Sequence, residues 1–201
     1  MKRLALALCL LAVPSAAMAD GDYRYELTPH LSYHMGGTFE TANPKLASNL
    51  EVDNGLAYGL AFDIPLSENL QLELLANTQN SDLFVDKGIF GPDIKSIETD
   101  ITYVHLGLLA QFGRPAVTPF FVVSAGIASI NPKFKGAGTD DQFSVSLGGG
   151  VKAFFTEHIG MRLEGRFFWS ALDSIQTSTA TYDYKSHLSQ FEGNVGLILA
   201  W

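Results

Sequence analysis

Two side chains near the end of the chain have the spacing of a catalytic nucleophile and its base. His187 and Ser189 are two residues apart, and Glu192 follows three positions later. Residues two apart point to the same face of an extended strand, so the imidazole could activate the hydroxyl for hydrolysis. The same alternation places Glu192 on the opposite face, and His30 and Ser32 repeat the spacing without an acid partner. We therefore interpret the pair as the polar end of a strand and predict no catalytic residue.

Three histidines could together bind a metal ion. His30 and His34 lie on one face of a strand if that segment is extended, and His105 lies in another segment of the same kind. The simpler interpretation is that these imidazoles point into the interior and form hydrogen bonds with Glu26 or Glu73. No ligand geometry follows from the spacing, so we predict no metal site and no cofactor-binding residue.

Three consecutive glycines, Gly148–Gly150, have the composition of a phosphate-binding loop. Such a loop needs a helix after it, whereas these glycines lie within an alternating segment that is typical of a strand. We expect the missing side chains to make room for large interior neighbours such as Phe154 and Phe168.

Acidic residues gather in the polar segments between the apolar ones. They lack the twelve-residue spacing of a calcium-binding loop, so we interpret them as solvated charges. The residues concerned are Asp82, Asp86, Asp93, Asp140 and Asp141.

The composition narrows the class of protein before any fold is considered. The chain has 201 residues, of which 47% are hydrophobic and 17% are charged, and its formal net charge is −8. The apolar content argues against a disordered chain, and the acidic balance argues against a nucleic acid partner. No apolar run reaches the ~18 residues that a membrane-spanning helix requires.

The beginning of the chain is typical of a secretory signal peptide. Lys2 and Arg3 precede a run of apolar residues, and small residues end at Ala19. We predict cleavage after Ala19, so that 1–19 is the signal peptide and 20–201 forms one exported domain. The single cysteine, Cys9, would leave with the signal, so the exported domain would have no disulfide and no cysteine nucleophile.

After residue 20 the hydrophobic pattern has a period of two, which predicts strands rather than helices. Leu163 and Phe167, for example, alternate with Arg162, Glu164 and Arg166. We predict eight strands, at 23–34, 56–64, 70–77, 103–112, 121–127, 143–155, 159–170 and 191–201. The predicted connections alternate between long polar ones, at 36–50, 79–98, 130–141 and 171–186, and short ones, at 67–69, 113–115 and 156–158.

Eight alternating strands predict a closed antiparallel up-and-down barrel, which can take two opposite forms. A soluble carrier of the lipocalin type holds its apolar residues inside, whereas a transmembrane barrel turns them outward to lipid. The second face of the strands favours the transmembrane form, because its charges could be buried only by pairing inside a narrow lumen. These charged residues are Glu26, Glu73, Lys152, Arg162, Glu164, Arg166 and Glu192.

Two features of the apolar face support the same choice. It continues for about nine to eleven residues in a strand, the length that a tilted strand needs to cross a bilayer. Aromatic residues lie at strand ends, where a transmembrane barrel has its interfacial belts. They are Tyr23, Tyr25, Tyr33, Phe112, Phe143, Phe155, Trp169 and Trp201.

Lipid imposes closure on such a barrel, because every backbone polar group must find a partner within the protein. We expect both termini at the end with the short connections, which is the periplasmic end, and the long connections outside. Pro29 lies within the first strand, where it removes a hydrogen-bond donor. We expect a bulge or a distorted row of hydrogen bonds there.

Three stretches of the chain together resemble the small eight-stranded outer-membrane barrels of the outer-membrane-protein-A and -X type. They are the signal ending in Ala17-Met18-Ala19, the segments 119–128 and 143–155, and the final strand with its aromatic last residue. In that family the barrel assembly machinery reads the last strand, and phenylalanine is the usual last residue, so Trp201 is a mild departure. The resemblance implies outer-membrane lipid and lipopolysaccharide as the surroundings of the barrel.

The family also bears on function. Its relatives include lipid A deacylases, which use a histidine and a serine two residues apart together with an acid, as in His187, Ser189 and Glu192. This pair lies nearer the C-terminus than the resemblance implies. We therefore expect a monomeric, non-enzymatic barrel with a lumen filled by side chains and a structural or surface-interaction role through four long loops. The alternatives are a narrow channel for small or hydrophobic solutes, a lipid A-modifying hydrolase and a soluble carrier.

Overall fold

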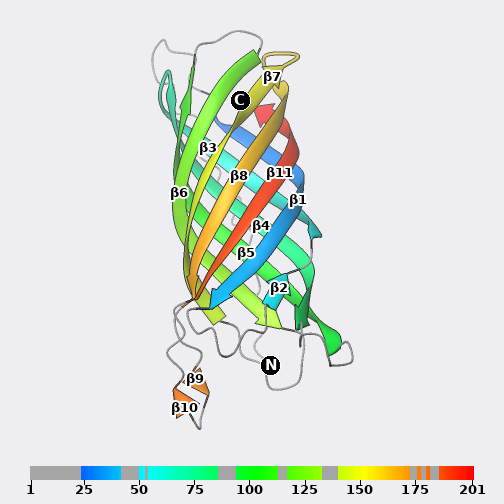
Figure 1. Ribbon diagram of the computed structural model, residues 1–201. Helices are drawn as coiled ribbons and strands as arrows, with labels where there is room; N and C mark the ends of the chain where they lie inside the picture. Colours follow the sequence, from blue (N-terminus) through cyan, green and yellow to red (C-terminus); the bar gives the residue numbers. More distant parts are fainter. Residues whose placement is uncertain are drawn as a thin grey trace, which may run out of the picture.

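The computed structural model is a closed antiparallel barrel (Figure 1). It describes residues 24–41, 50–52, 54–85, 94–112, 117–132, 140–172, 176–177, 180–181 and 186–201. Each wall strand pairs with the next along the chain, and the last strand closes the barrel on the first. The wall strands are β1 (Glu26–Thr41), β3 (Gly55–Ser67), β4 (Leu70–Val85), β5 (Ile94–Gln111), β6 (Val117–Pro132), β7 (Asp140–Phe154), β8 (Ile159–Leu172) and β11 (Ser186–Ala200). Within the described ranges, no helix is long and apolar enough to span a membrane.

The eight predicted strands are confirmed, but several are longer than the hydrophobic pattern indicated. β1 continues to Thr41 and β4 to Val85, and β5 begins at Ile94, so parts of the predicted long connections lie in strands. The backbone ladder does not require apolar side chains, and the pattern therefore misses strand ends that carry polar residues. Three short strands were not predicted: β2 (Leu50–Val52), which pairs with β1 and β4, and β9 (Gln176–Thr177) with β10 (Ala180–Thr181).

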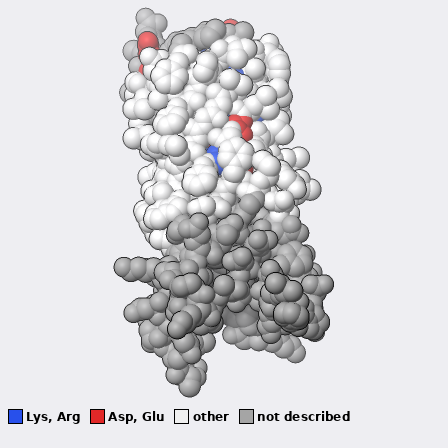
Figure 2. Space-filling model, viewed as in Figure 1, with Lys and Arg blue, Asp and Glu red and all other residues white. Residues whose placement is uncertain are grey.

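The wall is apolar outside and polar inside, as the transmembrane form requires. On β8, Leu163 exposes 44% of its surface, whereas its neighbour Arg162 exposes 1%. The part of the wall facing the viewer in Figure 2 is almost free of charged residues. The orientation predicted from the charged second face and the apolar first face is confirmed, and the alternative of a soluble carrier with an apolar interior is wrong.

Both ends of the barrel chain lie at the end with the short connections. Tyr25 and Trp201 exchange two backbone hydrogen bonds, of 3.0 and 3.1 Å, just beyond the paired residues Glu26 and Ala200. The rings of Tyr25 and Trp201 and that of Phe62 on β3 stack on one another, with centroids 6.2 to 6.3 Å apart. β1, β3 and β11 are therefore joined at this end by side chains as well as by the backbone ladder.

Pro29 interrupts the ladder on one side only. It keeps its register with Leu60 of β3, but no residue between Leu27 and His30 is paired with β11. The expected distortion of the hydrogen-bond row is thus confirmed. The shift in register between β1 and β11 lies further along the strand, between Met35 and Thr38.

Candidate functional site

A layer of ion pairs crosses the lumen and joins opposite sides of the wall. Its cations come from β7 and β8, and its carboxylates come from β1, β3, β4 and β8. All of these side chains are buried. We call them the ion-pair layer, and its members are Glu26, Asp63, Glu73, Lys152, Arg162, Glu164 and Arg166.

Two arginines form the centre of this layer. Alternation along β8 turns Arg162, Glu164 and Arg166 to the lumen together. The Nη2 atoms of Arg162 and Arg166 donate to the two carboxylate oxygens of Glu73, at 2.6 and 2.7 Å. Their Nε atoms donate to the two oxygens of Glu164, at 3.0 and 2.8 Å. Each carboxylate is therefore bound by two guanidinium groups, a planar arrangement that lysine side chains could not reproduce.

Lys152 extends the layer to the end of the barrel where the termini meet. Its Nζ donates to Glu26 at 2.7 Å, to Gln71 at 2.7 Å and to Asp63 at 3.2 Å. Gln71 in turn donates to Glu26 at 2.9 Å, and Arg162 donates to Asp63 at 3.2 Å. The bonds thus form one continuous network.

An apolar patch on β5 and β6 fills the space beside the cations. Phe120 packs with Leu109 and Val122, and its ring faces the basic groups. The guanidinium carbon of Arg162 lies 4.5 Å from the centre of this ring, and Nζ of Lys152 lies 5.7 Å from it. Both contacts are within the range of cation–π attraction, so Phe120 helps to compensate the burial of these charges.

A second layer, which we call the aromatic layer, consists of His34, Tyr103, His105 and Phe168. Tyr103 stacks on Phe168 with a centroid distance of 4.5 Å, and His105 meets both rings edge-on at 5.8 and 5.4 Å. His34 stacks on the same two rings at 6.2 and 5.9 Å. These four rings belong to three strands, one to β1, two to β5 and one to β8.

Glu192 connects the two layers. Its carboxylate lies 3.0 Å from Nε2 of His34 and accepts hydrogen bonds from Asn77, at 2.6 Å, and Asn194, at 3.0 Å. Asn194 also donates to Glu164 of the ion-pair layer, at 3.2 Å. The polar contacts therefore run without interruption from the aromatic layer to the ion-pair layer.

The structure places the three histidines in the lumen but corrects their expected partners. We expected bonds to Glu26 or Glu73. Instead, His34 contacts Glu192, His105 lies 2.9 Å from the hydroxyl of Ser124, and His30 lies 3.4 Å from the carbonyl of Thr28. Strand register decides these partners, because each imidazole reaches only its nearest neighbours. In the part of the chain that the structure describes, no group of three or more metal-ligating residues is arranged to hold an ion.

The candidate hydrolase residues do not converge. Glu192 points into the lumen, where it is fully buried. Ser189 is half-buried and pairs across the ladder with Trp169, a lipid-facing residue. The side chain of His187 lies outside the described residues. Ser189 and Glu192 therefore lie on opposite faces of β11, as the alternation predicted.

The glycine run makes room for different neighbours from those expected. A Cβ atom on Gly148 would lie 2.7 Å from Oε1 of Glu164 and 3.3 Å from Cγ of Arg166. A Cβ on Gly150 would overlap the backbone oxygen of Leu163. The lumen-facing glycines therefore give space to β8 and the ion-pair layer, and the expected role of Phe154 and Phe168 is wrong. The side chains of Asp82, Asp86, Asp93 and Asp140 lie outside the described residues, whereas Asp141 is exposed.

Sequence reasoning missed Asp63 as a member of the charged lumen. It lies on the lumen side of β3 and forms ion pairs with both Lys152 and Arg162. Asp63 alternates with the apolar residues Phe62 and Ile64, and this position on the opposite face of the strand could have identified it as a lumen residue. The described lumen thus holds five buried carboxylates against three basic side chains.

A closed barrel with an apolar outer wall and paired charges inside is a transmembrane β-barrel. A family model described as "Outer membrane protein beta-barrel domain" matches residues 5–196, so the chain belongs to this family. The protein is accordingly located in the outer membrane and surrounded by lipid.

Solved structures show the same fold at low sequence identity. Neisserial surface protein A is 8% identical over 87% of this chain and 96% of its own, with a TM-score of 0.62. OprG from Pseudomonas aeruginosa is 12% identical over 89% and 96%, and AlkL, solved in lipid bilayers, is 15% identical over 94% of both chains. Both have a TM-score of 0.62. Among curated proteins, no sequence matches.

Proposed function

We propose that this protein is a non-conducting, non-enzymatic barrel that supports the integrity of the outer membrane or mediates contacts at the cell surface. The filled lumen is the observation that carries the proposal. The ion-pair layer joins β7 and β8 to β1, β3 and β4, and the aromatic layer fills the lumen beside it. Eight strands leave an interior only wide enough for side chains. Side chains that fill the lumen in this way stiffen the barrel and leave little room for solutes to pass.

Conductance in planar bilayers tests the closed lumen. We expect no current steps from the purified barrel at any voltage that the bilayer withstands, while circular dichroism of the same sample reports folded strands. Steady single-channel steps would overturn the proposal and favour the narrow channel.

Cells can test the role at the surface. The connections after β1, β4, β6 and β8 leave the wall at the end opposite to Tyr25 and Trp201, where a rigid scaffold presents loops for binding. Removing the protein should increase the sensitivity of the envelope to detergent. A variant with the four connections shortened should restore resistance but not surface attachment. Unchanged detergent sensitivity and unchanged attachment would contradict both roles.

A further inference from the structure

Three carboxyl groups lie side by side in the lumen on neighbouring strands. Asp63 of β3 pairs directly with Glu26 of β1 on one side and with Glu73 of β4 on the other. All three side chains are buried, and Asp63 is 0% exposed. Residues directly opposite each other on neighbouring strands have Cβ atoms about 4.5–5.5 Å apart, so like charges there repel. We call this set the carboxyl row, and a charge on Asp63 would have a like charge on each side.

The cations beside the carboxyl row lie closer to its outer members. Nζ of Lys152 lies 2.7 Å from Glu26 but 3.2 Å from Asp63. Nη2 of Arg162 lies 2.6 Å from Glu73, whereas Nη1 lies 3.2 Å from Asp63. Both longer contacts are made with the same oxygen of Asp63, Oδ2. Among the described residues, these four side chains, from β1, β4, β7 and β8, are the charged groups that face Asp63.

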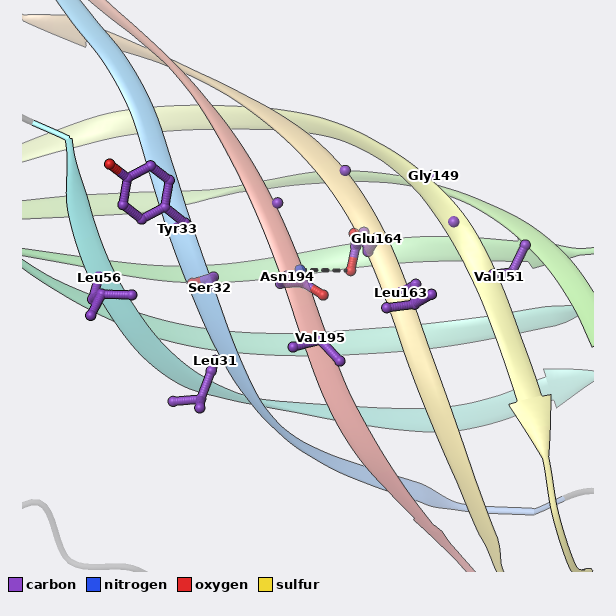
Figure 3. Close-up of a pocket in the computed structure, with 13 residues that line it drawn as sticks. Leu31, Ser32, Tyr33, Leu56, Gly149, Val151, Leu163, Glu164, Asn194 and Val195 are labelled. Carbon is purple, nitrogen blue, oxygen red and sulfur yellow. Dashed lines mark hydrogen bonds between the residues drawn. The ribbon is translucent and has the colours of Figure 1, made fainter.

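The other oxygen of Asp63 provides an independent observation. Oδ1 is buried and has no hydrogen-bond partner within the described part of the chain. By contrast, both oxygens of Glu26, Glu73 and Glu164 accept hydrogen bonds. Glu164 accepts a further bond from Asn194, which Figure 3 shows. Because a buried charged oxygen without a donor is costly, Asp63 is the carboxyl group of the ion-pair layer least suited to a negative charge.

The charge balance of the ion-pair layer leads to the same residue. The layer contains four carboxyl groups but three basic side chains. A buried group whose charge has no counterpart becomes neutral by a change in protonation, and carboxyl groups that share a site commonly retain a proton between them. A single proton would make the formal charge of the layer zero.

We propose that Asp63 binds one proton in the folded barrel at neutral pH and carries it on Oδ1. Oδ2 then still accepts hydrogen bonds from Lys152 and Arg162, so both contacts persist. The proton is taken up from solvent when the barrel folds and returns to solvent when it unfolds, because a solvated aspartic acid side chain is ionised at neutral pH. The folded state therefore binds one proton more than the unfolded state, and this site makes the barrel less stable as the pH rises.

Infrared spectroscopy of the folded barrel in lipid vesicles detects the proton directly. The carbonyl stretch of a protonated carboxyl group is well separated from the bands of a carboxylate. Labelling the side-chain carboxyl groups of aspartate with ¹³C shifts the band of an aspartic acid and leaves that of a glutamic acid in place. At neutral pH we expect one carboxylic acid band that shifts with this label and disappears in Asp63→Asn.

Glu192→Gln is the matched control for this measurement. It also replaces a fully buried carboxyl group of the lumen by its amide, but Glu192 lies outside the carboxyl row. The acid band should therefore persist in Glu192→Gln. Asp63→Asn should fold, since an amide of the same shape replaces a neutral group.

The pH dependence of unfolding provides a second measurement. Relative to Asp63→Asn, the equilibrium constant for unfolding of the unaltered barrel should rise about tenfold for each pH unit, the effect of one proton released on unfolding. Urea titrations in vesicles from about pH 6 to about pH 8, where solvated aspartate is ionised, measure this ratio. Comparison with the variant removes the contribution of the other titrating groups, which both proteins share.

Several results would overturn the proposal. One is the absence of the labelled acid band from the unaltered barrel, or its persistence in Asp63→Asn. Loss of the band in Glu192→Gln would assign the proton to Glu192 instead. Parallel pH dependence of the unaltered barrel and Asp63→Asn would show that Asp63 is ionised when folded. Failure of Asp63→Asn to fold would likewise contradict a neutral Asp63.

Discussion

Arg162 is the residue on which the lumen depends most. Its guanidinium group binds Asp63, Glu73 and Glu164, and its central carbon lies 4.5 Å from the centre of the Phe120 ring. Charge alone would not satisfy three carboxylates and a ring, because these partners lie in different directions around a planar group. Removal of this side chain would leave buried carboxylates with too few donors.

Arg162→Met should reduce the free energy of unfolding by about 3–5 kcal/mol, the usual cost of breaking a buried ion pair from one side. Urea titration of the barrel in lipid vesicles, followed by tryptophan fluorescence, measures this change. The free energy of unfolding of Arg162→Lys should lie between those of Arg162→Met and the unaltered protein, since lysine retains the charge but lacks the planar guanidinium group that binds two carboxylates at once. Arg24→Met, at the barrel end, serves as the control and should change stability by less than Arg162→Met. Equal effects of Arg24→Met and Arg162→Met would contradict the central role of Arg162.

Ser189→Ala tests the hydrolase alternative at the same scale. The substitution should leave the mass of lipid A unchanged in cells that produce the variant, because Ser189 and Glu192 have opposite parity on β11. Mass spectrometry of extracted lipid A, compared with that of cells lacking the protein, is the measurement. A lipid A species that disappears with the serine would revive the enzymatic interpretation.

At the scale of elements, the first and last strands close the barrel. The ladder between β1 and β11 is interrupted beside Pro29 and shifts in register between Met35 and Thr38. The ladder between β8 and β11 is continuous from Ser186 to Leu199. The seam between β1 and β11 is therefore the less regular of the two. We expect the stacked rings at its end to contribute to its stability.

Trp201→Ala should weaken this seam by about 0.5–1.5 kcal/mol for each of the two ring pairs that it removes, with Tyr25 and Phe62. Trp201→Phe should retain most of the stability, because a ring remains in place. Thermal unfolding measures the loss, and hydrogen exchange of the amides of Tyr25 and Trp201 locates it. If Trp201→Ala and Trp201→Phe unfold alike, the ring stack has no part in closure.

The barrel as a whole has the opposite arrangement to a soluble protein, because charged side chains lie in the lumen and large apolar side chains cover the outer wall. A charge placed on the outer wall should therefore be costly according to its depth in the membrane. Leu163 lies near the middle of the lipid-facing row of β8, four residues from Ile159 and six from Trp169, whereas Phe112 lies beyond the end of β5, near the chain termini.

Leu163→Arg should reduce stability by about 2–4 kcal/mol, the cost of arginine at the bilayer midplane, and Phe112→Arg by only ~0–1 kcal/mol near the interface. Urea unfolding in vesicles of defined thickness compares the two. Equal costs at both positions would contradict the placement of the membrane around the wall.

The period-two pattern by itself predicted the eight wall strands of a closed barrel and the two faces of each strand. The charges on one face, and the length and aromatic ends of the other, then assigned Arg162 to the lumen and Leu163 to lipid without coordinates. The pattern did not predict the strand ends beyond the membrane. Polar residues there form the backbone hydrogen bonds of the strand, but they show no alternation between apolar and polar side chains.

Only the tertiary structure decided which residues meet. His34 pairs with Glu192 and not with Glu26 or Glu73, and Asp63 joins Lys152 and Arg162 across the lumen. Only the folded barrel, likewise, brings Gly149, Gly165 and Gly193 into register on three neighbouring strands. Contacts across a lumen or along a hydrogen-bond row depend on stagger and tilt between strands, and alternation within a single strand contains no information about either.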